Sequence, residues 1–139
     1  MRKKLTIVIV LFFLASHMVM AQTDSSQLAK IYVIRSTGFG QSVVNFRLLV
    51  NNEIRCKIKN EHYSVFYLSP GTYVFNVTSF TVGKKERLGL ELPVEAGNTY
   101  YLNMVQRSKV LQTDLFVEEI TRNSAEQLLV KYKEDKKCD

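Results

Sequence analysis

The sequence predicts an all-β fold, an antiparallel β-sandwich of about seven strands with a C-terminal α-helix. Two observations carry this prediction. From Lys30 onward, short runs rich in Val, Ile, Tyr, Phe and Thr are separated at nearly regular intervals by Gly, Pro and Asn, a pattern typical of sandwiches and barrels. Near the C-terminus the apolar period becomes helical, with Ala125, Leu128 and Leu129 on one face.

Residues 1–21 have the three-part layout of a secretory signal. Basic residues at positions 2–4 precede an apolar run, and Val19-Met20-Ala21 is a small-x-Ala cleavage pattern. We expect cleavage before Gln22; the alternative is an uncleaved anchor, although spanning needs about 20 apolar residues and His17 interrupts the run. We therefore expect a periplasmic or secreted chain with no stable membrane insertion after cleavage.

Length and charge limit the organisation of the chain and its partners. We divide the 139 residues into a signal peptide (1–21), a linker (22–29), a β-sandwich domain (30–121) and a C-terminal helix with a charged tail (122–139). Three of the six net positive charges lie in the signal, which leaves +3 on the mature chain. Nucleic-acid binding usually needs a concentrated basic patch, so we expect no nucleic-acid partner.

The first strands follow from alternation. The run at 31–34 is apolar on both faces and is predicted to be central, whereas 44–50 alternates and has one inner face. Asn51-Asn52 is predicted to form a tight turn into a strand at 54–58, with Ile54, Cys56 and Ile58 facing inward.

A second pair of strands is predicted at 63–68 and 73–80. We expect Ser69-Pro70-Gly71 to join them in a type II turn, because proline suits its first corner and glycine its second. Leu88, Leu90 and Leu92 alternate up to Pro93, which belongs at a strand end or an edge. Gly97 turns the chain into 99–106, and 113–120 forms a further strand.

The C-terminal helix is predicted to begin with a capping box formed by Ser124 and Gln127. We expect its apolar face, which includes Tyr132, to dock on a sheet edge or an open end of the sandwich. A helix that reaches a partner protein is the alternative.

The two cysteines, Cys56 and Cys138, both lie in the mature chain, and an oxidising compartment allows them to pair. The alternative is a buried Cys56 and a free thiol on the tail. Neither cysteine has a metal-ligand spacing.

No catalytic, cofactor-binding or metal-binding residues are predicted. His62 is the only histidine after the signal, and Glu118-Glu119 would face opposite sides of a strand. No glycine-rich phosphate loop follows a strand, so we expect no cofactor. The candidate binding residues are exposed tyrosines, for which we name Tyr63, Tyr67 and Tyr101.

Three segments resemble the bacterial domain-of-unknown-function family 2846, which consists of small exported β-sandwich proteins. They are Ala29-Lys-Ile-Tyr-Val-Ile34, Leu68-Ser-Pro-Gly-Thr-Tyr73 and Ala96-Gly-Asn-Thr-Tyr-Tyr-Leu102. The Pro-Gly-x-Tyr turn is also similar to turns of transthyretin-like and PEGA-like modules. The resemblance implies a fold and no catalytic residues. Many relatives are lipoproteins, but this chain lacks an early cysteine, so membrane attachment is not implied.

Together these features predict a non-enzymatic, exported module of the bacterial cell envelope with a protein-binding or structural role. The expected partner is an envelope protein or a cell-wall component, and the sequence does not predict the oligomeric state. A glycan or cell-wall ligand-binding module is the first alternative, and an enzyme of unrecognised type is the second.

Overall fold

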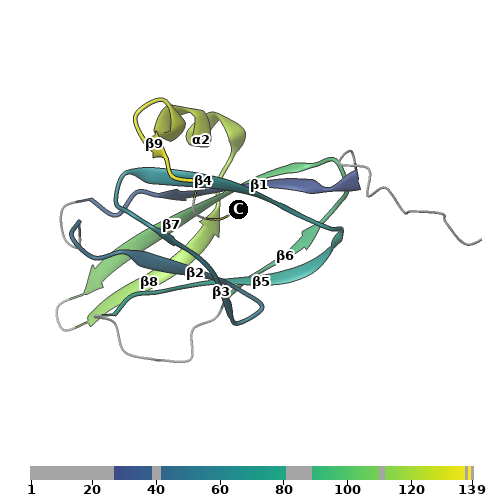
Figure 1. The fold of residues 1–139 in the computed structure, drawn as a ribbon. Helices are drawn as coiled ribbons and strands as arrows, with labels where there is room; N and C mark the ends of the chain where they lie inside the picture. Colours follow the sequence, from purple (N-terminus) through teal and green to yellow (C-terminus); the bar gives the residue numbers. More distant parts are fainter. Residues whose placement is uncertain (1–26, 39–41, 81–88, 110–111, 137, 139) are drawn as a thin grey trace, which may run out of the picture.

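The computed structural model describes residues 27–38, 42–80, 89–109, 112–136 and 138. These residues form two β-sheets packed face to face, with one short helix outside them (Figure 1). The predicted all-β sandwich with a C-terminal helix is thus confirmed. The signal peptide predicted at 1–21 lies outside the described residues.

The strand order differs from a purely antiparallel arrangement. One sheet has the order β8 (Gln112–Glu119), β7 (Thr99–Lys109), β1 (Ala29–Arg35), β4 (His62–Leu68) and β9 (Lys133–Glu134). The other has the order β3 (Glu53–Ile58), β2 (Phe46–Val50), β5 (Gly71–Thr78) and β6 (Leu90–Val94). β1 pairs with β7 and β4 pairs with β9 in parallel. The described residues therefore form nine strands in two sheets. The five-stranded sheet is mixed, because it contains both parallel and antiparallel pairs. The chain crosses between the two sheets several times.

The predicted central position of the first strand and the Asn51-Asn52 turn are both confirmed. β1 is the middle strand of the five-stranded sheet, and both asparagines have positive φ, at 51° and 67°. The inward position of Ile54 is wrong, since its side chain is 55% exposed. Leu48 pairs with Cys56 and the next residue, Leu49, pairs with Ile54. The bulge at Arg55 turns Ile54 to the outer face.

The predicted pairing of 63–68 with 73–80 is also wrong. β4 and β5 lie in different sheets, so Ser69-Pro70 crosses from one layer to the other. Gly71 starts β5 with a φ of 159°, whereas the second corner of a type II turn needs a φ near +80°. Gly97, in contrast, has a φ of 73° in the turn between β6 and β7.

The core lies between the sheets and includes the tail cysteine. Alternate residues of β1 supply Ala29, Ile31 and Val33, and β4 supplies Phe66. Each of these side chains is 1% exposed or less. The other members of the core are Phe46, Leu48, Cys56, Ile58, Phe75, Val77, Leu92, Val94, Leu102, Met104, Leu115, Val117 and Cys138.

The helix α2 (Arg122–Leu129) packs on the outer face of the five-stranded sheet, against β1 and β7 (Figure 1). Its N-cap is Thr121, whose side chain accepts a hydrogen bond from the Ser124 amide, so the capping box predicted at Ser124 is wrong. Ile34 and Ala125 are both fully buried and belong to no core cluster between the sheets. We assign their burial to this helix contact, which replaces the predicted docking at a sheet edge or open end.

Candidate binding groove

A row of tyrosines faces outward from β4 because strand residues alternate between the two faces of a sheet. Ser64 and Phe66 are buried toward the core, so Tyr63, Val65 and Tyr67 lie on the outer face. Tyr67 is the most open of them, with 52% of its surface exposed. Three of the seven residues of β4 therefore point their side chains away from the core between the sheets.

The neighbouring strand continues this aromatic surface. Tyr32 of β1 pairs across the sheet with Val65 and, on its other side, with Tyr101 of β7. The ring of Tyr32 stacks on that of Tyr101 with the centroids 5.1 Å apart, and it lies 6.4 Å from the ring of Tyr63. Three strands thus bring three tyrosines together on one face.

The C-terminal segment forms the opposite wall. After α2 the chain returns as β9, where Lys133 N–H donates to the Glu61 carbonyl at 3.2 Å and Asp135 N–H donates to the Tyr63 carbonyl at 2.7 Å. This pairing places Glu134 opposite Tyr63 on the outer side of the sheet. The wall is therefore made by residues far from β4 in the sequence.

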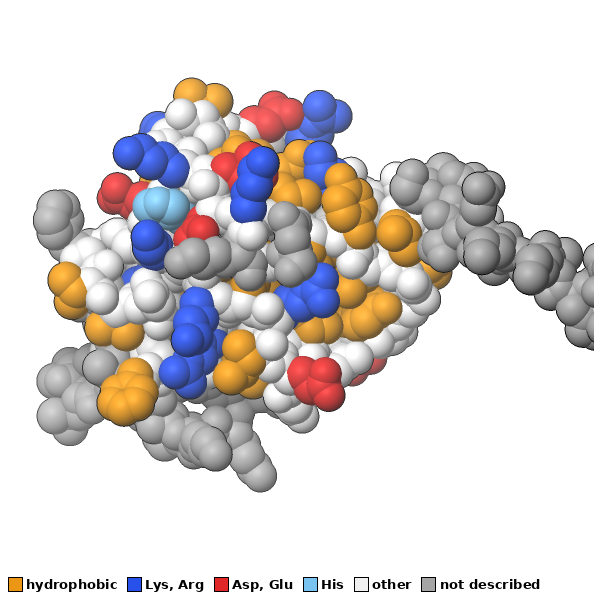
Figure 2. Space-filling model, viewed as in Figure 1, with side chains coloured by type: hydrophobic (Ala, Val, Ile, Leu, Met, Phe, Trp, Pro, Cys, Tyr) orange, Lys and Arg blue, Asp and Glu red, His pale blue; other side chains and the backbone are white. Residues whose placement is uncertain are grey.

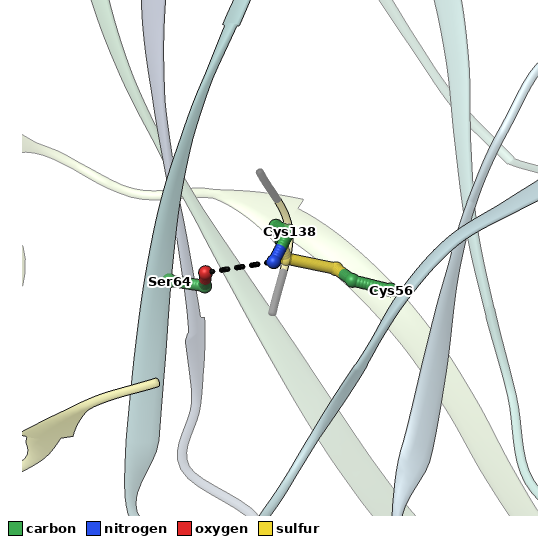
Figure 3. The surroundings of a disulfide bond; sticks show 3 residues. All are labelled: Cys56, Ser64 and Cys138. Carbon is green, nitrogen blue, oxygen red and sulfur yellow. Dashed lines mark hydrogen bonds between the residues drawn. A yellow bond between two sulfur atoms is a disulfide. The ribbon is translucent and has the colours of Figure 1, made fainter. Parts of the chain in front are cut away.

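A disulfide bond between Cys56 and Cys138 attaches this wall to the four-stranded sheet. Cys138 is 1% exposed, and its N–H donates to the Ser64 hydroxyl at 3.3 Å. Figure 3 shows Cys138 between the strand that carries Ser64 and the strand that carries Cys56. The tail thus passes from the outer face at Glu134 to the core at Cys138.

Between the tyrosines and the tail lies an open groove of about 320 Å³. It combines three aromatic rings with two ammonium groups and one carboxylate. Figure 2 shows hydrophobic and basic side chains interspersed over the side of the molecule that carries the tail. The residues that line the groove are Lys30, Tyr32, Tyr63, Val65, Tyr67, Glu134 and Lys136.

The charged groups of the groove interact with its rings. Lys30 Nζ lies 4.7 Å from the centroid of Tyr32, and the hydrogen bond with Tyr32 raises the pKa of Lys30. Burial raises the pKa of Tyr63, and the nearby Glu134 carboxylate raises it further. Lys30 therefore stays cationic and Tyr63 stays a neutral hydrogen-bonding phenol at neutral pH.

The structure brings together part of the predicted site. Tyr63 and Tyr67 line the groove, whereas Tyr101 lies behind Tyr32 and does not line it. Tyr32 and Val65 were missed, although their positions in alternating strands could have placed them there. Lys136 and Glu134 were missed because no local pattern indicates where a tail docks.

The other residues singled out lie away from the groove. His62 Nδ1 is 2.7 Å from the Asn60 carbonyl oxygen, and His62 does not line the groove. Pro70 and Gly97 are exposed in turns. No group of three or more His, Cys, Asp or Glu side chains in the described part of the chain could hold a metal ion. Among these same residues, no helix has the length and apolar content to cross a membrane.

The fold and the groove define a two-sheet β-sandwich whose disulfide-linked tail shapes an aromatic surface. The family model described as "Protein of unknown function (DUF2846)" matches residues 25–117, more than half of the chain. The chain therefore belongs to the DUF2846 family, as its strand and turn motifs indicated. Comparison with curated proteins gives no match. The matched range ends before α2, β9 and Cys138, so one groove wall lies outside the matched residues.

Proposed function

We propose that this protein is a non-enzymatic, exported binding module of the bacterial cell envelope, and that its groove binds an envelope protein. The observation that carries the proposal is the row of Tyr63, Tyr32 and Tyr67 beside an open groove. Tyrosine offers a large apolar ring with a polar end, a combination common in binding sites. The groove is also within the usual size of ligand sites, about 300–1,000 Å³.

Two features support export. The N-terminal residues have the order of a secretory signal, and disulfide bonds such as Cys56–Cys138 persist mainly in oxidising compartments. The chemistry of the groove supports a binding role over catalysis. Its carboxylate, Glu134, has no histidine beside it in the lining, and a general acid–base pair must lie within hydrogen-bond reach of its substrate.

Immobilised mature chain, beginning at Gln22, can test the proposal with solubilised envelope proteins and purified cell-wall sacculi applied separately. We expect envelope protein to be retained, and Tyr67→Ala to reduce retention. Ile54→Ala is the matched control, because Ile54 is equally exposed but lies on the other sheet. Equal retention by both variants, or no retention by the native chain, would overturn the proposal.

A glycan or cell-wall ligand is the second candidate. The observation that favours it is the exposed Tyr67 ring, which lines the same groove as the hydrogen-bonding groups of Lys30 and Glu134. Retention of sacculi that is lost in Tyr67→Ala and kept in Ile54→Ala would support this candidate over an envelope protein.

A further inference from the structure

The edges of the two sheets differ in how they are protected. β3 carries Glu53, Arg55 and Lys57 on its exposed side and has a bulge, and β6 contains Pro93. Charges, bulges and prolines are the usual devices that prevent an edge strand from pairing with another chain. Both edges of the four-stranded sheet are therefore closed to strand addition.

The described residues pair with the outer edge of β4 over only part of its length. β9 pairs with His62 and Tyr63, and its continuation at Asp135 still bonds to Tyr63. Within the described residues, no backbone partner lies beyond Tyr63 on that side of β4. The stretch for which the described residues supply no such partner is Val65-Phe66-Tyr67-Leu68, which contains neither a charge nor a proline.

The hydrogen bonds of β9 show which backbone groups are free there. The carbonyls of Glu61 and Tyr63 point away from β1 toward the tail. Because backbone groups alternate sides along a strand, the N–H and C=O groups of Val65 and Tyr67 point the same way. The side chains of these two residues line the groove. A ligand in the groove thus lies beside both these side chains and backbone groups that have no partner among the described residues.

We propose that an extended segment of a partner protein adds to the five-stranded sheet as a strand beside Val65 and Tyr67, with alternate side chains in the groove. This inference rests on the proposed binding function and names the form of the partner. Main-chain hydrogen bonds supply affinity in this mode of recognition, and pockets for alternate side chains supply specificity. The groove and the free edge share the same residues, as such a mode requires.

The charges of the groove select the partner. Lys30 and Lys136 supply two positive charges against the one negative charge of Glu134. An added segment with an acidic side chain on the groove side is therefore favoured. A second copy of the same edge is disfavoured, because it would bring like-charged lysines together.

The test uses linear peptides selected from a random phage-displayed library against the native oxidised chain. We expect enriched peptides to carry acidic residues at alternate positions. N-methylation of a selected peptide at alternate residues removes the donors of one side of its strand. Methylation of the set of alternate residues whose N–H groups face β4 should weaken binding about tenfold or more, which corresponds to the loss of about two hydrogen bonds. Methylation of the other set of alternate residues should have little effect.

Two variants at Tyr67 distinguish the contribution of its backbone N–H to peptide binding from the contribution of its aromatic ring. Tyr67→Pro removes the outward N–H without touching the β1 ladder, a place where edge strands tolerate proline, and Tyr67→Val keeps the N–H and removes the ring. We expect a greater loss of peptide binding in Tyr67→Pro than in Tyr67→Val, with both folded by circular dichroism. The N-methyl series applies even if Tyr67→Pro does not fold.

An equal loss of peptide binding from methylation of either set of alternate residues would overturn strand addition. So would self-association of the free chain in sedimentation experiments, since it would make a second copy the occupant. If no peptide is enriched but cell-wall sacculi bind and Tyr67→Ala releases them, strand addition fails while a groove-binding role survives. If neither binds, both proposals fail.

Discussion

Cys56 of β3 and Cys138 of the C-terminal tail are joined by a disulfide although 82 positions separate them. The bond connects the four-stranded sheet to the segment that pairs with β4 of the other sheet. One covalent link therefore holds both layers and one wall of the groove.

Removal of this link should destabilise the domain. Closing a loop of this length stabilises a fold by up to about 4–5 kcal/mol in the chain-entropy model, and measured gains are often smaller. We expect Cys138→Ser to lower the free energy of unfolding in urea by about 2–4 kcal/mol. Cys56→Ser should have a similar effect, because either change opens the same loop. Reduction of native chain that leaves the unfolding midpoint unchanged would contradict the expected stabilisation.

Arg35 supports the fold from inside it. Its side chain is fully buried, stacks 3.7 Å from the centroid of the Phe46 ring and donates to the carbonyls of Val44 and Ile58. Replacement of Arg35 by Met keeps an apolar stem but removes these donors, together with the Nε–H that donates to Thr37 Oγ1 at 3.0 Å, and a carbonyl left buried without a donor costs about 1–3 kcal/mol. We expect destabilisation of about 3 kcal/mol by urea unfolding, with Arg35→Lys less affected. Native-like stability of Arg35→Met would show that these hydrogen bonds contribute nothing.

The helix cap offers a paired comparison. Thr121 accepts a hydrogen bond from the Ser124 amide at 3.3 Å, so Thr121→Ala should cost about 1 kcal/mol of stability. Ser124→Ala keeps that amide and should cost only a few tenths of a kcal/mol. Thermal unfolding of the two variants is the measurement. A greater loss in Ser124→Ala would instead support the capping box that the sequence suggested.

Alkaline pH should weaken the fold partly through Tyr63. Burial and negative neighbours raise the pKa of Tyr63 and of Tyr132, so the folded chain retains these phenol protons longer than the unfolded chain. This stabilisation is complete below a pH of about 10 and is lost as the pH rises through the raised pKa. Arg35, whose pKa burial lowers to about 10, has the opposite effect.

Comparison of the native chain with Tyr63→Phe isolates the contribution of Tyr63 to the pH dependence of the free energy of unfolding. Above a pH of about 10, the free energy of unfolding should fall more steeply for the native chain than for Tyr63→Phe, because the contribution of Arg35 is common to both. Parallel curves would mean that Tyr63 is not desolvated in the folded chain.

Local chemistry predicted the Asn51-Asn52 turn and the inward faces of most strands, but not the crossing between the sheets at Ser69-Pro70. Asn51 and Asn52 adopt the positive φ that their residue type favours. The bulge at Arg55 could not be predicted, because an extra residue in one strand leaves the alternation of its sequence unchanged. Alternation also says nothing about which sheet a strand joins, so β4 and β5 were paired wrongly.

Part of the groove lining could be predicted for a similar reason. Tyr63 and Tyr67 are two positions from Val65 on either side, so strand periodicity places all three on one face. The tail residues Glu134 and Lys136 reach the groove through long-range contacts of β9 and Cys138, and no local pattern encodes them.

Residue-resolved hydrogen exchange along β4 reports directly whether the edge of this strand is open. If the edge beyond Tyr63 is free, the amides of Val65 and Tyr67 should exchange orders of magnitude faster than those of Ser64 and Phe66, which point toward β1. Selected peptide should then slow the two fast amides. Equal protection of all four amides in the free protein would contradict an open edge, and with it strand addition at the groove.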